Sequence, residues 1–283
     1  MSGNAILGYN NRIGEFTLTA GVSVSGLGPE NVQTRNLWEV WRTGVNSLAL
    51  SWIGGVRQAG AAPVRLFAAL NGSWGVGASA RLTLKKSGAS VYDSGWTGAV
   101  PELTPFDDRD FERENFWDGR PTQQEYALFP HNIILVLPSL ISCDEFLLEI
   151  DDTAGAAGGF DLSRIFIGDG MQPYYNMDWG GSIRHEALAY VAAARSGQRQ
   201  VEEYTPPRAC TVAFNHLTPT EAGWLLDIQR IARAQGEVLW VPAPDDGARI
   251  FREGFAGTLS ELPAIARVHF GNDSAEFSIR EWM

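Results

Sequence analysis

Apolar and polar residues alternate along much of the chain, which is the pattern of strands that bury one face. The first such run is IGEFTLTAGVSVSG, in which Phe16, Leu18, Val22 and Val24 alternate with polar or small residues. This run ends at the sequence GLGP, whose glycines and proline interrupt a strand. We therefore expect residues 1–30 to form an N-terminal strand or arm that reaches onto something else.

Further alternating runs follow in series: NSLALSWI, VRLFAAL, ARLTL and ASVYDSGW, and later HNIILVL, EFLLEI and LSRIFIG. Leu48, Leu50 and Trp52 share one expected strand face, and Leu82 and Leu84 share another. The turns expected between these runs lie at Gly54-Gly55, Asn71-Gly72 and Ser87-Gly88. Many short antiparallel strands with one long surface loop predict a jelly-roll β-sandwich over residues 31–172.

The pattern changes after residue 172, and we expect a smaller β-domain, a sandwich or barrel, over residues 173–283. IRHEALAYVAAARSG fits a helix by its alanines and a strand by its alternation, and we favour a strand that returns along QRQVEEYTPPR. Thr218, Pro219 and Glu221 form a capping box with proline at the first helical position. They predict a helix over about 219–235, stopped by Gly236. EVLWVP, RIFREGF, AIARVHF and AEFSIRE complete the predicted sheet.

Composition supports a mainly β fold: 31 glycines and 14 prolines supply turns, and 10 tryptophans supply core aromatics. The net charge of −11 disfavours nucleic-acid binding, because phosphates attract lysine and arginine. Cys143 and Cys210 stand far apart in apolar runs, which indicates buried free thiols. The longest apolar run, IILVLPSLI, is too short to cross a bilayer, and the N-terminus lacks the pattern of a signal peptide. We expect a soluble protein.

The polar excursion from Pro101 to Pro121 carries two kinds of candidate chemistry. Its acids are Asp107, Asp108, Asp110, Glu112 and Glu114. They could bind calcium, but they lack EF-hand spacing, and Arg109, Arg113 and Arg120 lie among them. A solvated or interface loop is therefore favoured. Its aromatics are costly in water and predict packing on their own domain or on a neighbour. Together with two residues of the arm they form the predicted partner interface: Phe16, Leu18, Phe106, Phe111, Phe116 and Trp117.

No catalytic motif is present: the chain lacks GxSxG, HExxH, a P-loop and a GxGxxG that opens a helix. Its four histidines show no metal-ligand spacing. We therefore predict a protein that is not an enzyme and has no cofactor or metal. An alternative use of the tryptophans is a platform on which sugars stack, with Trp74, Trp96 and Trp117 as candidates. Core or interface positions are the favoured interpretation.

The segment EIDDTAGAAGGF raises a separate question, because Asp151 and Asp152 are adjacent acids beside a glycine-rich loop. Adjacent acids on a strand point to opposite faces, so they make a poor facing pair. We expect them to accept hydrogen bonds from loop backbone, and the glycines to adopt positive φ. The following MQPYYNMDWGG is expected to carry the chain into the second domain as a hinge.

Ordered segments of the chain resemble tail proteins of long-tailed, non-contractile bacteriophages, from about Asn36 to the C-terminus. These segments are NLWEVWRTG, VYDSGW, HNIILVLPSL and EFLLEIDDTAGAAGGFDLSRIFIGDGMQPYYNMDWGG, then PPR and FNHLTPTEAGWLLDIQR. The resemblance implies a galactose-binding-like jelly roll joined to a tail-tube-like β-domain with one helix. It implies a virion structural protein of the tail tip, similar to a distal tail or baseplate protein, made in the host bacterial cytoplasm.

The partners implied are other copies of the chain in a homo-oligomeric ring, a trimer or hexamer, and the tube, hub, tape-measure and fibre proteins of the tail. No nucleic-acid sequence recognition and no membrane span are expected. The alternative function is a carbohydrate-binding module of a phage tail, which attaches to the host surface. An exposed tryptophan pair on the sandwich, free of subunit contacts, would favour this alternative.

Overall fold

The computed structural model describes residues 3–47, 49–153, 155, 158–187, 189–193, 199–203, 205–269 and 271–282, which form two compact units. Unit 1 is built mainly from Asn10–Gly170 and Val241–Gly254, and unit 2 from Asn4–Tyr9, Met171–Trp240 and Phe255–Met283. The predicted domains differ from these units at two places. The segment Asn4–Tyr9 belongs to unit 2, and the segment Val241–Gly254 returns to unit 1.

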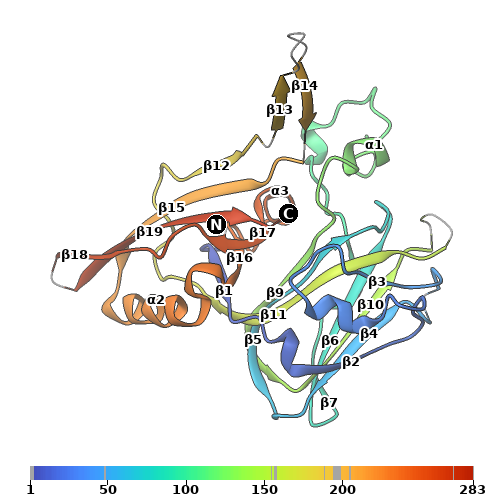
Figure 1. The fold of residues 1–283 in the computed structure, drawn as a ribbon, viewed down its shortest axis with the longest axis horizontal. Helices are drawn as coiled ribbons and strands as arrows, with labels where there is room; N and C mark the ends of the chain where they lie inside the picture. Colours follow the sequence, from blue (N-terminus) through green and yellow to red (C-terminus); the bar gives the residue numbers. More distant parts are fainter. Residues whose placement is uncertain are drawn as a thin grey trace. The chain divides into compact units, whose positions relative to one another are not determined.

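Unit 1 is a sandwich of two antiparallel sheets (Figure 1). One sheet has the order β2 (Phe16–Ala20), β4 (Trp52–Arg57), β10 (Glu145–Asp151), β6 (Ser79–Lys86) and β7 (Ala89–Asp93), with β8 (Thr97–Gly98) on β6. The other has the order β11 (Asp161–Met171), β5 (Ala62–Gly72) and β9 (Ile133–Cys143), with β3 (Trp41–Arg42) on β11. Short helical turns η1 (Ile13–Glu15) and η2 (Pro29–Gln33) connect the first strands.

The core of unit 1 lies between these sheets and forms because alternate residues of each strand face inward. Leu82 and Leu84 of β6 are both fully buried, as predicted. Phe146 of β10 contacts Phe16 of the same sheet edge-on at 5.3 Å and Phe67 of β5 at 5.7 Å between ring centroids, so the Phe67–Phe146 pair joins the two sheets. The predicted mainly β, jelly-roll fold is confirmed.

The N-terminal segment, expected to be a strand or an arm that reaches onto something else, forms strands within this chain. Residues 16–20 form β2, which pairs with β4 from Phe16↔Arg57 to Ala20↔Ile53 at the edge of the sandwich. Phe16 is only 4% exposed and belongs to the core, and Leu18 is partly buried against it. Upstream, β1 (Ile6–Tyr9) carries the buried Ile6 and Leu7. The alternation that suggested an arm is the ordinary pattern of an edge strand with one buried face.

The predicted strand at NSLALSWI is wrong in its start and in its face. Leu48, Leu50 and Trp52 were expected to share one strand face, but the strand begins at Trp52, and its buried residue is Ile53. Leu48 lies outside the described residues. Gly54-Gly55 is no turn but the middle of β4, paired with Leu147 and Phe146 of β10. A Cβ at Gly55 would lie 2.6 Å from the Phe146 ring, so glycine allows this ring to pack across the strand.

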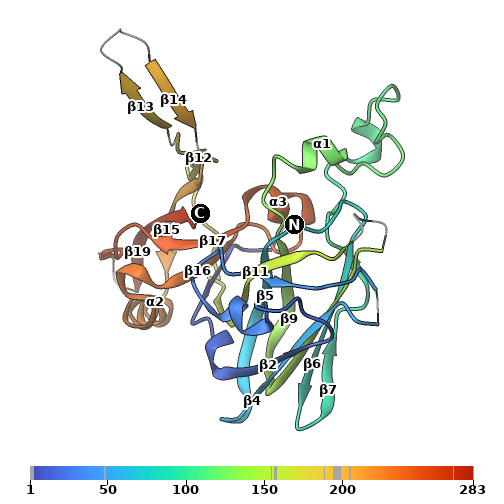
Figure 2. The ribbon, with the colours of Figure 1, turned by 45° about the vertical axis from the view of Figure 1, so that its right-hand side comes forward.

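Unit 2 is an antiparallel sheet in the order β12 (Ser182–His185), β15 (Arg208–Leu217), β19 (Asn272–Glu281), β17 (Phe255–Leu259), β16 (Glu237–Val241) and β1, with β18 (Ile265–His269) on β19. A separate hairpin of β13 (Ala189–Ala193) and β14 (Arg199–Glu203) belongs to this unit, and Figures 1 and 2 show it as its own two-stranded ribbon. The prediction that IRHEALAYVAAARSG forms strands and returns along QRQVEEYTPPR is confirmed for these described strands.

Helix α2 (Pro219–Ala232) packs on the sheet of unit 2 and continues into the turn η4 (Arg233–Gln235). Both halves of the predicted capping box are present: Thr218 accepts from the Glu221 amide, and Glu221 accepts from the Thr218 amide at 2.7 Å. Leu225 and Ile228 are buried in the core of this unit. The predicted helix over about 219–235 is therefore confirmed.

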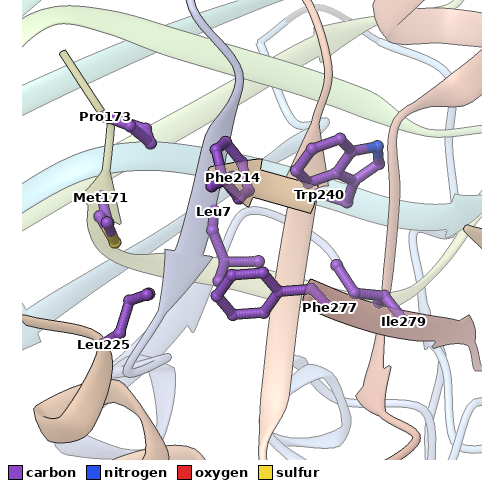
Figure 3. A pocket seen from close by; sticks show the side chains of 8 residues that line it. All are labelled: Leu7, Met171, Pro173, Phe214, Leu225, Trp240, Phe277 and Ile279. Atoms are coloured by element: carbon purple, nitrogen blue, oxygen red, sulfur yellow. The ribbon is translucent and has the colours of Figure 1, made fainter. Parts of the chain in front are cut away.

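Eight apolar side chains of unit 2 surround a small cavity of about 10 Å³ (Figure 3). They come from β1, the end of β11 and the segment after it, β15, α2, β16 and β19, and are Leu7, Met171, Pro173, Phe214, Leu225, Trp240, Phe277 and Ile279. A space of this volume holds about one water molecule. It is a packing gap in the core rather than a ligand pocket.

The predicted strand at RIFREGF is wrong: Gly247–Glu253 forms helix α3, which belongs to unit 1. Asp246 caps it by accepting from the Arg249 amide at 3.0 Å, a signal that the sequence DDGAR contains. The inner residue Phe251 packs 5.2 Å from Phe129 and 6.1 Å from Tyr126. The alternation of Ile250 and Phe251 with charged residues fits a short amphipathic helix as well as a strand.

The two cysteines are free and buried, as predicted, one in the core of each unit. Burial raises the pKa of the Cys143 thiol to about 11 and that of Cys210 to about 12. Both thiols are therefore protonated at neutral pH and are poor nucleophiles. In the part of the chain that the structure describes, no helix is both long and apolar enough to cross a membrane.

The glycine-rich segment after β10 is a turn held by its acids. Asp152 is buried and accepts from the Gly75 amide at 3.1 Å, and Asp151 accepts from the Thr153 amide at 3.1 Å. Gly158 and Gly159 adopt φ of +117° and +100°. Asp169 accepts from Asn10 and pairs with Arg12. Asp151 and Asp152 thus accept from loop backbone, as predicted, whereas Asp169 bonds to side chains.

Replacement of Asp152 with asparagine should leave unit 1 as stable or more stable at neutral pH. Burial raises the pKa of Asp152 in the folded chain, so the ionised form works against folding as pH rises through that raised value. The asparagine oxygen can still accept from Gly75. Thermal melts should favour the variant at pH 7 and converge with wild type below the ordinary carboxyl pKa. A large loss of stability at pH 7 would show that the charge itself is needed.

Candidate binding surface

The long loop of unit 1 is closed at its base like an Ω-loop. The amides of Leu103 and Thr104 both donate to the carbonyl of Gly119, at 2.9 and 3.2 Å. Gly119 has a φ of +62°, and a Cβ there would lie 2.6 Å from the Thr104 oxygen, so this position requires glycine. We call residues 104–118 the aromatic loop. It contains the turn η3 (Phe106–Asp108), and helix α1 (Gln123–Tyr126) follows it.

The aromatic loop lies at the end of unit 1 opposite the β6–β7 turn. Its chain leaves β8, which pairs with the first residues of β6, whereas the turn at Ser87-Gly88 joins the last residues of β6 to β7. Figures 1 and 2 show the loop and α1 together in green at this end. The loop therefore stands on the rigid strands of the sandwich, which is where binding residues are commonly presented.

Arg109 holds the interior of the loop. Its Nε donates to the carbonyl of Thr104 at 2.9 Å, and its Nη1 donates to the carbonyls of Phe116 at 3.1 Å and Trp117 at 2.9 Å. Its Nη2 pairs with Glu102 at the base of the loop. The side chain is only 7% exposed. One guanidinium thus fixes both ends of the loop, in the forked geometry that only arginine offers.

Four aromatic side chains of this loop form a cluster, which we call the aromatic cluster: Phe106, Phe111, Phe116 and Trp117. Phe116 is partly buried, and the other three are exposed. Phe116 is central, with ring centroids 5.7 Å from Phe106, 5.1 Å from Phe111 and 5.1 Å from Trp117. Phe111 is 76% exposed and Trp117 is 79% exposed. Exposed aromatic patches on an ordered scaffold mark interaction sites, because apolar surface of this kind is unfavourable in water.

The other predicted site residues do not join this cluster. Phe16 and Leu18 belong to β2, so their prediction as partner contacts is wrong for Phe16, whose ring is buried. Trp74 is fully buried, and no sugar can stack on it. Trp96, in the turn after β7, is 43% exposed but makes no ring contact with the aromatic cluster among the described residues. The candidates that the structure brings together are therefore those of the loop.

A second aromatic surface was missed by the sequence interpretation, which treated MQPYYNMDWGG as a hinge. In unit 2, the segment 173–179, here called the aromatic strap, exposes Tyr174, Tyr175 and Trp179. Its backbone is nevertheless fixed: Asn4 donates to the carbonyls of residues 173 and 174 at 2.8 and 2.7 Å. The Tyr174 amide donates to Glu221 at 2.6 Å. Three aromatic residues within six positions were the available signal.

Glu221 links the strap to the start of α2. Its buried carboxylate accepts from the Tyr174 amide and from both the amide and the hydroxyl of Thr218. Although burial favours the neutral acid, the hydrogen bonds from Tyr174 and Thr218 lower the pKa of Glu221. The strap therefore has a defined conformation at neutral pH, and its exposed rings are presented rather than loosely attached.

Unit 2 also has an open groove of about 710 Å³ between α2 and the β18–β19 hairpin. Its lining is mixed, with Ala222 and Leu226 from the helix and Ile265 and Arg267 from β18. Among the described residues, no three His, Cys, Asp or Glu side chains lie close enough together to hold a metal ion.

The chain matches no protein-family model and no curated protein. Its structural neighbours are carbohydrate-binding modules with the galactose-binding-like jelly roll. One is the family 32 module of NanJ from C. perfringens, solved with galactose: 14% identity, TM-score 0.38, covering 58% of this chain and 99% of the module. Another is chitosan-binding module 1 of a chitosanase/glucanase from Paenibacillus sp. IK-5: 14% identity, TM-score 0.36, covering 57% of this chain and 100% of the module.

A family 89 glycoside hydrolase from Clostridium perfringens is similar at 10% identity and a TM-score of 0.36, covering 62% of this chain and 16% of the hydrolase. All three TM-scores are below 0.5, and the fold described above rests on the strands and their pairing. None of these three structures is a phage tail protein, so the resemblance of the sequence to tail proteins stays a prediction.

Proposed function

We propose that the chain is a carbohydrate-binding protein, and that the aromatic loop of unit 1 is its binding surface. The observation that carries the proposal is Trp117, whose indole is 79% exposed while its backbone carbonyl is held by Arg109. Sugars present flat apolar faces that stack on exposed aromatic rings, and hydroxyl groups that bond to polar neighbours. Such a binding surface needs no catalytic step.

Fixation of the loop before binding favours affinity. A ligand that must order a mobile loop loses part of its interaction free energy to that ordering. Here the base of the loop, the Arg109 contacts and the ring-to-ring contacts already define the positions of Phe116 and Trp117. Asp118 and Asn115 flank the tryptophan; Asn115 donates to the Arg120 carbonyl at 2.5 Å and keeps its amide oxygen for a hydroxyl group.

Replacement of Trp117 with alanine should lower the affinity for polysaccharide at least about ten-fold, which corresponds to about 1.4 kcal/mol. The ring is exposed, so the melting temperature should change little. Trp38→Ala is the matched control, because Trp38 is an 89% exposed tryptophan of the same unit outside the loop. A glycan array followed by calorimetry on the best ligand measures the effect. Equal binding by both variants would refute the proposal.

The aromatic strap supports a second function, assembly as a structural component of a phage tail tip. Its exposed Tyr174, Tyr175 and Trp179 are residue types enriched at protein interfaces. The two edges of the β13–β14 hairpin are not paired to other described strands. Open edges of this kind pair between subunits, and head-to-tail contacts close into rings. The ring, its order and the tail partners are parts of this proposal.

For the second function, light scattering of the pure chain should give the mass of a ring, and Tyr175→Asp with Trp179→Ala should reduce it to that of a monomer. A charge introduced into an interface is costly because it must be desolvated without a partner. Trp224→Ala, at an exposed tryptophan on α2, is the control within the same unit. A wild-type chain that stays monomeric at high concentration and is absent from virions would exclude this function.

A further inference from the structure

The aromatic cluster lies within a strongly acidic stretch of chain. The residues from Asp107 to Asp118 include six carboxylates and two guanidiniums. Five of these carboxylates are exposed and form no ion pair among the described residues: Asp107, Asp108, Glu112, Glu114 and Asp118. The fold keeps these charges on the same closed loop as the exposed rings, so a ligand that reaches Trp117 also meets their negative potential.

The two guanidiniums of the loop do not offset this potential at its surface. Arg109 is buried, paired with Glu102 and bonded to three carbonyls. Arg113 is exposed, and its Nε lies 4.0 Å from Asp110 Oδ2. It therefore offsets the charge of Asp110 alone. The surface that surrounds Phe111 and Trp117 therefore remains negative at neutral pH.

We propose that this loop selects polysaccharides whose sugars carry free primary amines in the ammonium form. This inference rests on the proposed carbohydrate-binding function and names its ligand class. The face of an aromatic ring attracts a cation, tryptophan most strongly, and the neighbouring carboxylates add to that attraction. A neutral sugar gains the stacking alone. A sugar acid meets repulsion from the same carboxylates.

The geometry favours a polymer of amino sugars over a lysine-rich peptide. The rings of the cluster are inclined to one another by 53°, 72° and 79°, so they present faces in several directions along the loop. A chain of rigid pyranose rings offers a flat apolar face and an ammonium group on each unit. A lysine side chain carries its ammonium on a flexible stem, and loses more conformational entropy when it is immobilised.

The test measures binding of the full chain, at about pH 6, to soluble oligomers of glucosamine and of N-acetylglucosamine, which share a backbone and differ in charge. We expect the glucosamine oligomer to bind at least about ten-fold more tightly in about 50 mM salt. The ratio should fall below about three-fold in about 500 mM salt, because salt screens exposed charges. An oligomer of a sugar acid and an oligolysine of matched charge complete the set of probes.

The decisive variant neutralises four of the five unpaired carboxylates, Asp107→Asn, Asp108→Asn, Glu112→Gln and Glu114→Gln, and keeps Asp118, which accepts from the Arg120 amide. It should bind the N-acetyl oligomer as wild type does and lose the preference for the amine. The control makes the same change of charge at exposed acids outside the loop: Glu30→Gln, Asp227→Asn, Glu261→Gln and Glu276→Gln. This control should keep the preference.

The outcomes separate the two proposals. Equal, Trp117-dependent binding of both oligomers would overturn the charge selection and leave the carbohydrate-binding function in place. No binding of any oligosaccharide would overturn both. A preference for the amine that survives neutralisation of the loop would overturn the role of these carboxylates. Binding of oligolysine as tight as that of the glucosamine oligomer would show a general cation surface and overturn the assignment to amino sugars.

Discussion

Replacement of Arg109 with alanine should abolish ligand binding by the aromatic loop as fully as loss of Trp117, although Arg109 itself is buried. The change removes the donor for the carbonyls of Thr104, Phe116 and Trp117 and leaves Glu102 without its partner. Hydrogen bonds that involve a charged group contribute about 1.5–3 kcal/mol each. Their loss favours open conformations of the loop, and the apparent affinity falls with the fraction that remains closed.

Two measurements identify this mechanism for Arg109. Limited proteolysis should cleave the loop of Arg109→Ala and spare that of wild type, because cleavage requires local opening. Calorimetry should show the loss of binding. Arg109→Lys should also fail, since an ammonium cannot donate to separate carbonyls in fixed directions. Arg113→Ala is the control, because its ion pair with Asp110 is exposed and surface pairs contribute little. A protease-resistant Arg109→Ala variant that binds normally would contradict the role of Arg109.

The role of Arg109 could not be predicted from sequence, where it was counted as a charge among acids. Its partners Thr104, Phe116 and Trp117 are brought to it by the closure of the loop at Gly119. The sequence indicated that the four aromatics of this polar stretch pack on their own domain or on a neighbour, because such rings are costly in water. In the chain by itself, Phe106, Phe111 and Trp117 are exposed. Composition thus located the surface, and the fold of the loop determines which rings of the set act together.

Local sequence patterns predicted an element well where residues close together in the chain fix its backbone. The capping box of Thr218 and Glu221 located α2 because its hydrogen bonds involve neighbours in the chain. Local patterns predicted less well which residues of a strand face the core. Ile53 is the buried residue at the start of β4, and this strand continues through Gly54 and Gly55, where the Phe146 ring packs. That contact joins residues about ninety positions apart, and no local pattern contains it.

The membership of segments in the two units was also beyond local patterns. Residues 4–9 lie in unit 2 although unit 1 follows them directly, and α3 lies in unit 1 although it comes late in the chain. The unit to which a segment belongs depends on the buried side chains against which the segment packs. Phe251 of α3 completes the packing of Phe129 and Tyr126, which the sequence could not indicate.

Loss of the buried ion pair between Arg208 and Glu281 should cause the largest fall in the stability of unit 2. Arg208 begins β15 and Glu281 ends its neighbour β19. The amide and Nε of Arg208 each donate to Glu281 Oε2 at 2.8 Å, and its guanidinium lies 5.2 Å from the centre of the Phe255 ring. The side chains of Arg208 and Glu281 are 3% and 10% exposed, so each charge has little contact with water and is stabilised by the other.

Arg208→Met should lower the free energy of unfolding by about 3–5 kcal/mol, because it leaves the Glu281 carboxylate buried without its partner. The double variant Arg208→Met with Glu281→Met should recover most of that loss, since two apolar side chains of similar size can replace a buried pair. Urea unfolding of the full chain, with hydrogen exchange at the β15 and β19 amides to assign the transition to unit 2, measures both. If the double variant were as unstable as the single one, the pair would stabilise the sheet through its specific hydrogen bonds and not through mutual neutralisation of charge.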